Sequence, residues 1–115
     1  MKGYMYILLC ADNTYYTGST INLEIRLMLH QLSRGAGYTK KRLPVKLIYF
    51  EEHKRIDLAF LREKQVQGWS RKKKEALMKS MSEELHRLAA CMNETNYLIY
   101  HAKQDLTRNS NPGLA

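Results

Sequence analysis

Apolar and aromatic residues fill the stretch from residue 4 to residue 11, and the polar pair Asp12-Asn13 follows it. This pattern predicts a strand over 4–11, a turn at the polar pair and a return strand over 14–19. A second stretch, over 45–50, alternates apolar with other residues and predicts a third strand. The chain therefore contains three predicted strands, of which the first two form a hairpin.

Helical spacing of apolar residues appears between and after these strands. Leu23 and Leu27 fall on one face of a predicted helix, for which Thr20 and Asn22 are alternative N-caps. Residues 33–43 are small, polar and basic, which favours a loop. Two further helices are predicted over residues 56–66 and 71–81. The order of elements predicts an α+β fold in which helices flank a small antiparallel sheet.

The last third of the chain has an apolar periodicity of its own. Ser82 is typical of a helix start, because its hydroxyl can cap the helix and two acidic residues follow it. Apolar residues then recur at helical spacing, at Leu85, Leu88, Ala89 and Met92, and a second apolar patch follows at 97–100. From residue 104 the chain is polar and is predicted to be disordered. The predicted parts are a domain over 1–81, a helical extension over 82–103 and a tail over 104–115.

The apolar stripe of this extension needs a cover, because an exposed patch of that extent is unusual on a monomer. Packing back on the same chain and pairing with a second copy would both cover it. Packing on the same chain is favoured, because it loses no association entropy. A monomer is therefore favoured over a homodimer.

Positive charge is concentrated in the first part of the chain. The 115 residues carry a net charge of +8, and residues 1–81 account for all of it, with 16 Lys or Arg against 7 Asp or Glu. Residues 82–115 carry 3 basic and 4 acidic residues. A basic domain attracts polyanions by counterion release, and nucleic acid is the commonest such partner. A basic protein without that role fits the charge equally well.

Other sequence features argue against secretion and membrane insertion. The two cysteines, Cys10 and Cys91, lie far apart, which favours reduced thiols over a disulfide framework. The chain has no apolar run of the roughly 20 residues that a membrane helix needs. Its N-terminus lacks the features of a signal peptide. We therefore expect a cytoplasmic protein.

A series of short motifs runs through the first two thirds of the chain. They are Tyr4-Met5-Tyr6, Tyr16-Thr17-Gly18, Arg26 with His30, Gly35 to Thr39, Leu61-Arg62-Glu63, and Gly68-Trp69-Ser70 before four basic residues. In order and spacing they resemble the GIY-YIG nuclease superfamily, and most closely its small stand-alone bacterial members. The resemblance covers roughly residues 2 to 81. It implies a three-stranded sheet, with Gly18 as a structural residue of the second motif.

The resemblance also assigns roles in phosphodiester cleavage. Tyr6 would be the base that activates water, although a phenol is a poor base at neutral pH unless a cation or metal-bound water lowers its pKa. Tyr16 would orient the water or the phosphate. Arg26 would contact the scissile phosphate with its planar fork. His30, one turn after Arg26, would relay a proton or hold the phosphate. Packing roles for the tyrosines and the histidine, and a solvated Arg26, are the alternatives.

A metal ion is the implied cofactor, and nucleic acid the implied partner. Glu63 would bind one Mg²⁺ or Mn²⁺ ion, whose remaining positions water and substrate would fill, so that binding is complete only with substrate. A surface glutamate paired with Arg62 or Lys64 is the alternative. DNA is favoured over RNA as the substrate. The basic residues expected to contact nucleic acid are Lys40, Lys41, Arg42, Arg71, Lys72, Lys73 and Lys74.

Two aromatic residues and two departures from the family pattern bear on substrate preference. Tyr38 and Trp69 are candidate stacking surfaces for unpaired bases, although Trp69 also suits a core position. Gln67 and Gln31 stand where close relatives often carry lysine and asparagine. We therefore expect a metal-dependent endonuclease that is structure-selective or nonspecific. The alternative is a nucleic-acid-binding module that keeps the fold without turnover and pairs through its C-terminal extension.

Overall fold

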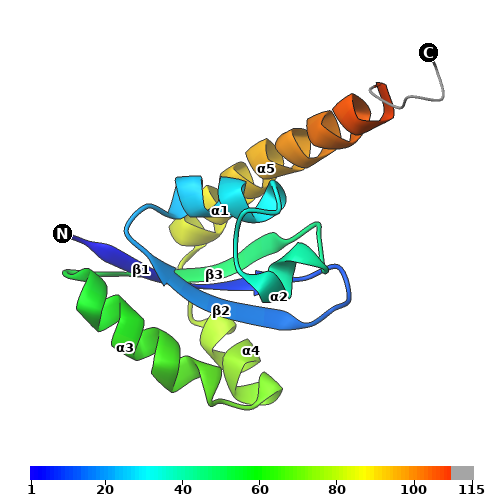
Figure 1. The fold of residues 1–115 in the computed structure, drawn as a ribbon. Helices are drawn as coiled ribbons and strands as arrows, with labels where there is room; N and C mark the ends of the chain where they lie inside the picture. Colours follow the sequence, from blue (N-terminus) through cyan, green and yellow to red (C-terminus); the bar gives the residue numbers. More distant parts are fainter. Residues whose placement is uncertain (110–115) are drawn as a thin grey trace.

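Three strands and five helices make up residues 1–109, which are the residues that the computed structural model describes (Figure 1). Side chains are described through residue 106. The elements are β1 (Gly3–Leu9), β2 (Tyr15–Thr20), α1 (Leu23–Gln31), α2 (Gly37–Lys40), β3 (Lys46–His53), α3 (Ile56–Gln67), α4 (Arg71–Lys79) and α5 (Glu83–Asn109).

The three strands form one antiparallel sheet in the order β2-β1-β3. Tyr6, in the central strand, faces Gly18 of β2 on one side and Phe50 of β3 on the other. The predicted fold class is therefore confirmed as α+β with a three-stranded antiparallel sheet. Because β2 is an edge strand, residues on helices from either face of the sheet can reach its open side.

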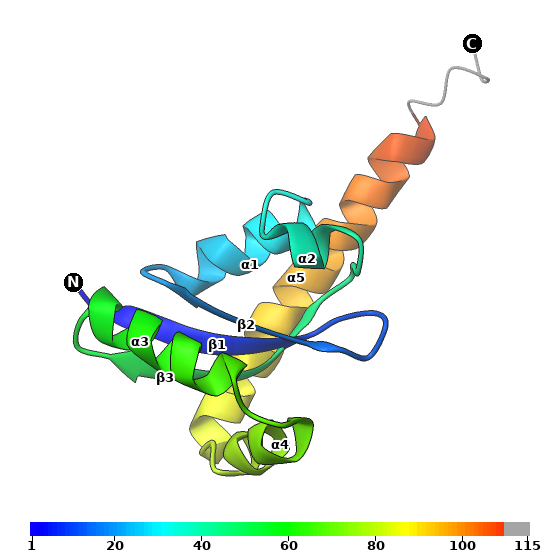
Figure 2. The same ribbon diagram turned by 60° about the horizontal axis from the view of Figure 1, so that its bottom comes forward.

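Helices cover both faces of the sheet, and α1 and α3 lie on opposite sides of it in Figures 1 and 2. Helix α5 packs against α1 and β3 on the α1 side, where Leu85 and Met92 lie next to Tyr4 and Phe50. Successive residues of a strand point to opposite faces, so Tyr6 faces the α1 layer and its neighbours face α3.

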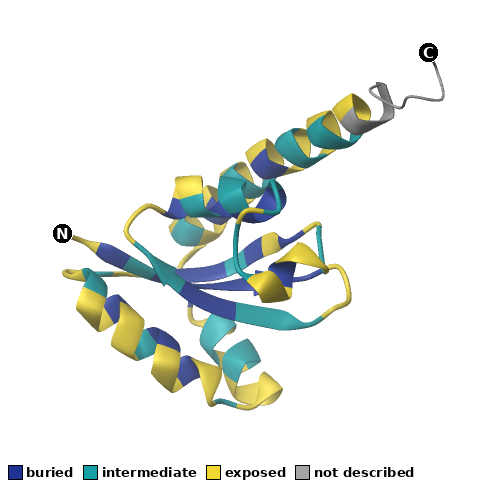
Figure 3. Cartoon of the chain, viewed as in Figure 1, coloured by how far each residue is buried: buried dark blue, intermediate teal, exposed yellow. Residues whose placement is uncertain are grey.

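Burial is concentrated on the strands and on the helix surfaces that face them (Figure 3). The central strand is covered from both sides, and its residues Met5, Tyr6, Ile7 and Leu8 are all fully buried. This explains why β1 reads as a continuous apolar run rather than as an alternation.

Side-chain caps fix where three of the helices begin. Asn22 Oδ1 accepts from the Ile25 N–H at 3.1 Å, so Asn22, rather than Thr20, caps α1. Ser70 caps α4 in the same way, and Ser82 accepts from the Leu85 N–H at 3.3 Å at the start of α5. Each cap satisfies an N–H group that has no partner within its helix.

Two stretches differ from the sequence-based prediction. The predicted loop over 33–43 contains the one-turn helix α2, whose residue Thr39 is buried. The predicted disorder from residue 104 is wrong over 104–109, where α5 continues to Asn109. Residues 103–108 are mostly good helix formers, and neither glycine nor proline interrupts them before Pro112. The rest of the predicted tail lies outside the described residues.

The first half of α5 packs on its own domain. Ala89 is buried, and Leu85 and Met92 pack against the core. Asn93 donates to the Leu47 carbonyl at 2.8 Å and accepts from the Leu47 N–H at 2.7 Å, which pairs the exposed edge of β3. The second half of α5 extends beyond the domain in Figures 1 and 2. Leu85, Ala89 and Met92 of the apolar stripe are thus covered within the chain, whereas Leu88 is 46% exposed.

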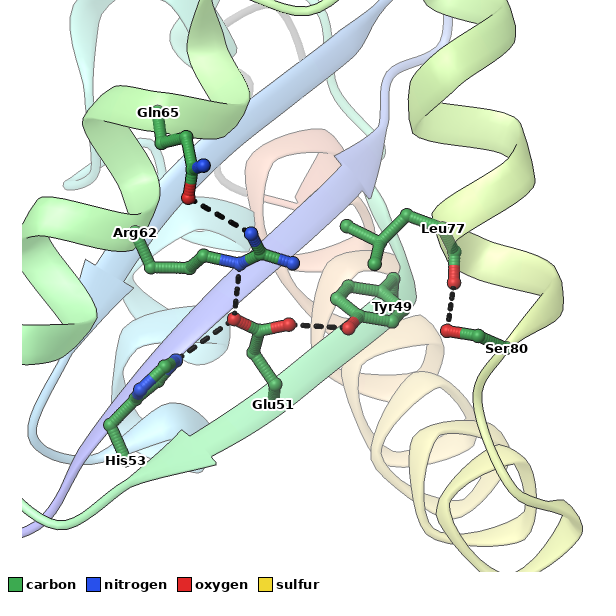
Figure 4. A network of polar contacts seen from close by, with 7 residues as sticks. All are labelled: Tyr49, Glu51, His53, Arg62, Gln65, Leu77 and Ser80. Atoms are coloured by element: carbon green, nitrogen blue, oxygen red, sulfur yellow. Dashed lines mark hydrogen bonds and ion pairs between the residues drawn. The ribbon is translucent and has the colours of Figure 1, made fainter.

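A polar network joins β3 to α3 on the opposite face of the sheet (Figure 4). The Glu51 carboxylate accepts hydrogen bonds from the Tyr49 hydroxyl, from His53 Nε2 at 2.8 Å and from Arg62 Nε at 2.8 Å. Arg62 also donates to Gln65 at 2.9 Å. Burial raises the pKa of Glu51, but these three hydrogen bonds outweigh it and hold the pKa below its ordinary value.

Replacing Glu51 with glutamine is expected to lower the free energy of unfolding at pH 7 by about 1–3 kcal/mol, because the charged acceptor of three donors is lost. The folded-state pKa of Glu51 is depressed, so its contribution is present above the unfolded-state pKa and disappears as pH falls through the folded-state value. Urea titrations of the wild type and the variant at pH 7 and pH 3 measure both effects. Glu52→Gln is the matched control, because Glu52 is exposed and its change should stay within about 0.5 kcal/mol. Equal losses in the two variants would contradict the prediction.

Candidate active site

The hairpin register brings the two tyrosines of the signature motifs together. Tyr6 pairs with Gly18. Tyr16 lies two residues before Gly18 on β2, on the same face of the sheet. The ring centroids of Tyr6 and Tyr16 are 6.4 Å apart. A Cβ atom on Gly18 would lie 2.6 Å from the Tyr6 hydroxyl oxygen and 2.7 Å from Cζ. Glycine at position 18 therefore makes the space that the Tyr6 phenol occupies.

His30 reaches the same place from the last turn of α1. It is fully buried, and its Nε2 lies 2.9 Å from the Tyr6 hydroxyl oxygen. Its Nδ1 lies 2.8 Å from the Thr39 hydroxyl oxygen. The edge of its ring packs against Tyr16, with ring centroids 5.4 Å apart. The structure thus brings Tyr6, Tyr16 and His30 into direct contact.

Arg26, one turn before His30, supplies the positive charge of this cluster. Burial raises the pKa of Tyr6 to about 12, and the Arg26 guanidinium opposes that rise. Burial, together with the charge of Arg26, lowers the pKa of His30 to about 4. Burial also raises the pKa of Tyr16. At neutral pH the cluster therefore holds a neutral imidazole and protonated phenols beside one cation.

Glu63 approaches from the other face of the sheet, on α3, and meets the open side of β2. Its Oε1 accepts from the Ser19 hydroxyl at 2.7 Å, and its Oε2 accepts from Gln67 Nε2 at 2.9 Å. Gln67 also donates to the Thr17 carbonyl at 3.2 Å. The negative charge of Glu63 raises the pKa of Tyr6, so the carboxylate lies within electrostatic reach of the tyrosine cluster.

The chemistry of Glu63 suits a hard divalent cation held through few protein atoms. It presents carboxylate oxygens, the ligands that Mg²⁺ prefers, and Mg²⁺ commonly binds one or two carboxylates while keeping several waters. No cluster of three or more His, Cys, Asp or Glu side chains occurs among the described residues. Lys64 Nζ lies 3.3 Å from Oε2 and already neutralises part of the charge. The residues present therefore fit a single ion that Glu63 would hold together with substrate and water oxygens, rather than an ion enclosed by protein ligands.

The predicted basic residues lie in two places, at α2 and at α4. Lys40, Lys41 and Lys72 are exposed. Two arginines hold the tip of the β1–β2 hairpin: Arg42 Nε donates to Asp12 at 2.9 Å, and Arg71 donates to the Asn13 carbonyl at 2.8 Å.

The remaining basic residues of α4 make fewer polar contacts with the domain. Lys73 lies over the Trp69 ring, 4.2 Å from its centroid, and Lys74 is partly exposed. Lysines thus supply most of the uncommitted positive charge, whereas the two arginines also brace the hairpin.

The two predicted stacking surfaces are already in contact with other side chains. Tyr38 stacks on Tyr16, with ring centroids 6.1 Å apart, and the Arg42 guanidinium lies 3.8 Å from the centroid of Tyr38. Trp69 packs against the core and contacts Arg62 and Lys73. Tyr38 therefore buttresses Tyr16, and an unpaired base would have to displace Arg42 to stack on it.

Sequence reasoning assigned no site role to four residues that contact either His30 or Glu63. Thr39 and Gly35 contact His30, and Ser19 and Gln67 fix the Glu63 carboxylate. Gly35 and Thr39 both belong to the motif that spans residues 35–39. That motif was the sequence feature that could have pointed to their place in the site. The departure at Gln67 now has a structural consequence, because its amide links Glu63 to β2.

Comparison with known proteins identifies the family of the chain. Residues 2–76 match the GIY-YIG catalytic domain, and the chain belongs to that family of nuclease domains. The match ends before α5 begins. No helix within residues 1–109 is both long enough and apolar enough to cross a membrane.

Several relatives are UPF0213 proteins. The one from Syntrophus aciditrophicus (strain SB) is 44% identical over 85 residues, which cover 73% of this chain and 98% of the relative. The one from Streptococcus sanguinis (strain SK36) is 54% identical over 52 residues, or 45% of this chain and 60% of that relative. The NMR structure of a UPF0213 protein from Bacillus halodurans shares 37% identity, covering 69% of this chain and 84% of that one, with a TM-score of 0.46.

Proposed function

We propose that this chain is a metal-dependent endonuclease that hydrolyses phosphodiester bonds, with DNA favoured over RNA and structure-selective or nonspecific cutting. The observation that carries the proposal is the buried hydrogen bond between the Tyr6 hydroxyl and His30 Nε2, next to the Arg26 cation. A phenol joined to a neutral imidazole and flanked by a guanidinium provides a proton path and a phosphate contact in one place.

The pKa values of Tyr6 and His30 define how the proton moves. Transfer of the Tyr6 proton to His30 is unfavourable in the free protein, because the pKa of Tyr6 is raised to about 12 and the pKa of His30 is lowered to about 4. A preformed phenolate is therefore excluded as the resting state. A bound phosphate favours the imidazolium form of His30 through its negative charge, provided that Tyr6 stays neutral during the transfer.

Hydrolysis then proceeds by two linked proton transfers. As the water oxygen bonds to phosphorus, its proton passes to the Tyr6 oxygen while the Tyr6 proton passes to His30 Nε2. The bond from phosphorus to the leaving oxygen breaks, and that oxygen takes a proton from solvent. His30 then releases its extra proton to solvent, which restores the neutral imidazole. Arg26 binds the non-bridging phosphate oxygens, whose charge grows in the transition state. Tyr16, held by Tyr38 and His30, orients the phosphate or the water.

Glu63 would hold the divalent ion at the edge of β2. Mg²⁺ or Mn²⁺ there supplies charge stabilisation for the leaving oxygen. Ser19 and Gln67 fix the rotamer of the carboxylate before any ion binds. Because a single carboxylate binds Mg²⁺ weakly, substrate oxygens have to complete the coordination.

A cleavage assay on defined substrates tests the proposal. The protein is incubated with Mg²⁺ or Mn²⁺ and labelled single-stranded, duplex, flap and branched DNA and RNA, with EDTA as the metal-free control. Cleavage that EDTA abolishes and that Arg26→Ala lowers by about 10²–10³-fold is the expected result. Binding without cleavage of any substrate would instead support the non-catalytic binding module.

The exposed lysines predict a salt-dependent affinity. If Lys72 and Lys73 bind phosphates, replacing both with glutamine should weaken binding of all sequences alike. It should also reduce the slope of log affinity against log salt by about 0.7–0.9 for each phosphate that is no longer neutralised. Fluorescence anisotropy with a labelled oligonucleotide measures the slope. The salt concentration is varied from roughly 50 to 200 mM, because phosphate contacts change the affinity strongly over that range. Lys54→Gln, an exposed lysine beyond β3, is the control. An unchanged slope in the double variant would place α4 away from the nucleic-acid path.

A further inference from the structure

The His30 imidazole has a second hydrogen bond that its role as a proton acceptor does not explain. Thr39, on α2, is fully buried, and its hydroxyl oxygen lies between His30 Nδ1 at 2.8 Å and the Ala36 carbonyl at 3.0 Å. The one-turn helix α2 therefore places a single hydroxyl against the far side of the His30 ring.

Counting protons along this chain of hydrogen bonds selects one tautomer. A carbonyl oxygen only accepts, so the Thr39 hydroxyl donates to Ala36 and offers a lone pair to His30 Nδ1. His30 Nδ1 must then carry the imidazole proton, which leaves Nε2 as an acceptor. Tyr6 donates to Nε2, and each proton of the series has an acceptor.

The opposite tautomer leaves a buried proton without an acceptor. With the proton on Nε2, His30 would donate to the Tyr6 oxygen, which already interacts with the Arg26 guanidinium. The Tyr6 proton would then have no acceptor among the described residues that contact its oxygen. A buried polar group without a partner is costly, so this arrangement is disfavoured.

Gly35 keeps the Nδ1 side of the ring open for this contact. A Cβ atom on Gly35 would lie 2.3 Å from His30 Nδ1 and 2.8 Å from Cγ. Any side chain at position 35 would therefore push the imidazole away from its present position. Gly35 and Thr39 together determine where the ring sits and which nitrogen faces Tyr6.

We propose that Thr39 is a positioning residue of this site, which holds His30 in the Nδ1–H tautomer so that Nε2 faces Tyr6 as the proton acceptor. The catalytic part of this proposal rests on the proposed nuclease function. The tautomer itself is a property of the folded chain and is measurable without any substrate.

The first experiment reads the tautomer directly. Long-range ¹H–¹⁵N correlation spectra of the full chain at pH 7 distinguish the two neutral forms, and the signals that vanish in His30→Gln assign the residue. The wild type should show His30 protonated on Nδ1. Thr39→Val should populate the Nε2–H form, whereas Thr39→Ser should keep the wild-type form. Thr39→Ala replaces Thr39→Val if the valine variant does not fold.

Thr17→Val is the matched control, because Thr17 is also a buried threonine and its hydroxyl has no hydrogen-bond partner among the described residues. It should leave the His30 spectrum unchanged. A wild-type protein with His30 protonated on Nε2 would overturn the proposal regardless of any variant. So would a folded Thr39→Val or Thr39→Ala protein that keeps the Nδ1–H form in full.

The second experiment reads the consequence for cleavage. Thr39→Val should lower kcat by about 10²-fold, the lower end of a general acid–base contribution, with KM nearly unchanged. Thr39→Ser and Thr17→Val should stay within a few-fold of the wild type. A wild-type protein that cleaves nothing would refute the proposed function, while the spectra would still decide the tautomer. An active protein whose Thr39→Val variant keeps its kcat would refute the positioning role alone.

Discussion

Replacing Tyr6 with phenylalanine is expected to lower the cleavage rate constant by about 10²–10⁴-fold, the range of a general acid–base contribution. The phenol oxygen is the one atom of Tyr6 that hydrogen-bonds to His30 Nε2, and the ring itself is fully buried in the core. Phenylalanine keeps the ring and removes only the oxygen. The fold should therefore survive, and the loss should appear in kcat rather than in KM.

Single-turnover cleavage of the best substrate, with enzyme in excess, measures this effect. Tyr4→Phe is the matched control, because Tyr4 lies on the same strand and its hydroxyl contacts Glu52 rather than the cluster. Its rate should remain within a few-fold of the wild type. Circular dichroism on both variants establishes that the comparison is between folded proteins. Equal rates in Tyr6→Phe and Tyr4→Phe would remove the Tyr6 hydroxyl from the mechanism.

Removing the charge of Glu63 provides a second test of the same site. Glu63→Gln keeps an oxygen for Ser19 but loses the anionic ligand proposed for the metal. Cleavage should fall, and raising the Mg²⁺ concentration should not restore it. The different metal dependence separates this variant from Tyr6→Phe, because Tyr6 is assigned no contact with the ion.

Local patterns along the chain were sufficient to predict the sheet and most helices. The apolar run of β1, the polar turn after it and the helical spacing around Leu27 each depend on neighbouring residues only. Asn22 and Ser70 begin their helices because a side-chain oxygen three residues before an N–H group can cap it. Such signals lie within a few positions and do not require knowledge of the fold.

The arrangement of the candidate site depends on contacts between distant elements, which a single sequence does not specify. The pairing of Tyr6 with Gly18 requires the hairpin register, since a shift by one residue would turn Tyr16 to the other face. The Thr39 contact requires α2 to fold back on α1. A small polar segment without apolar periodicity gave no local signal for that helix.

The surroundings of Glu63 show the same limit. Its two anchoring hydrogen bonds span 44 residues to Ser19 of β2 in one case and four residues along α3 in the other. A Glu–Gln pair at i and i+4 on a helix is visible in the sequence, but the hydrogen bond from Gln67 to the Thr17 carbonyl is not. Sequence therefore supplied the candidate groups, and tertiary packing determined which of them touch.

Deleting α5 is expected to have the largest effect on stability. A chain that ends at Met81 loses the packing of Leu85, Ala89 and Met92 on the sheet and the two hydrogen bonds of Asn93. At about 1–2 kcal/mol for each of the two large, partly buried side chains and about 1 kcal/mol for each hydrogen bond, the loss is about 4–6 kcal/mol. Whole domains of this size are stable by only about 5–15 kcal/mol. The shortened chain should therefore melt at least about 15 °C lower or fail to fold.

A chain that ends at Lys103 is the matched control for this deletion. It keeps the packed half of α5 and the Lys103 contact with Ser33 at 2.9 Å. It removes Leu106, which is 69% exposed and adds little to the core. Its melting temperature should stay within a few degrees of the full chain. Sedimentation of all three chains at several concentrations identifies any dimer. A full chain that is dimeric, with a Met81 truncation that is a stable monomer, would contradict intramolecular packing and assign α5 to an interface between copies.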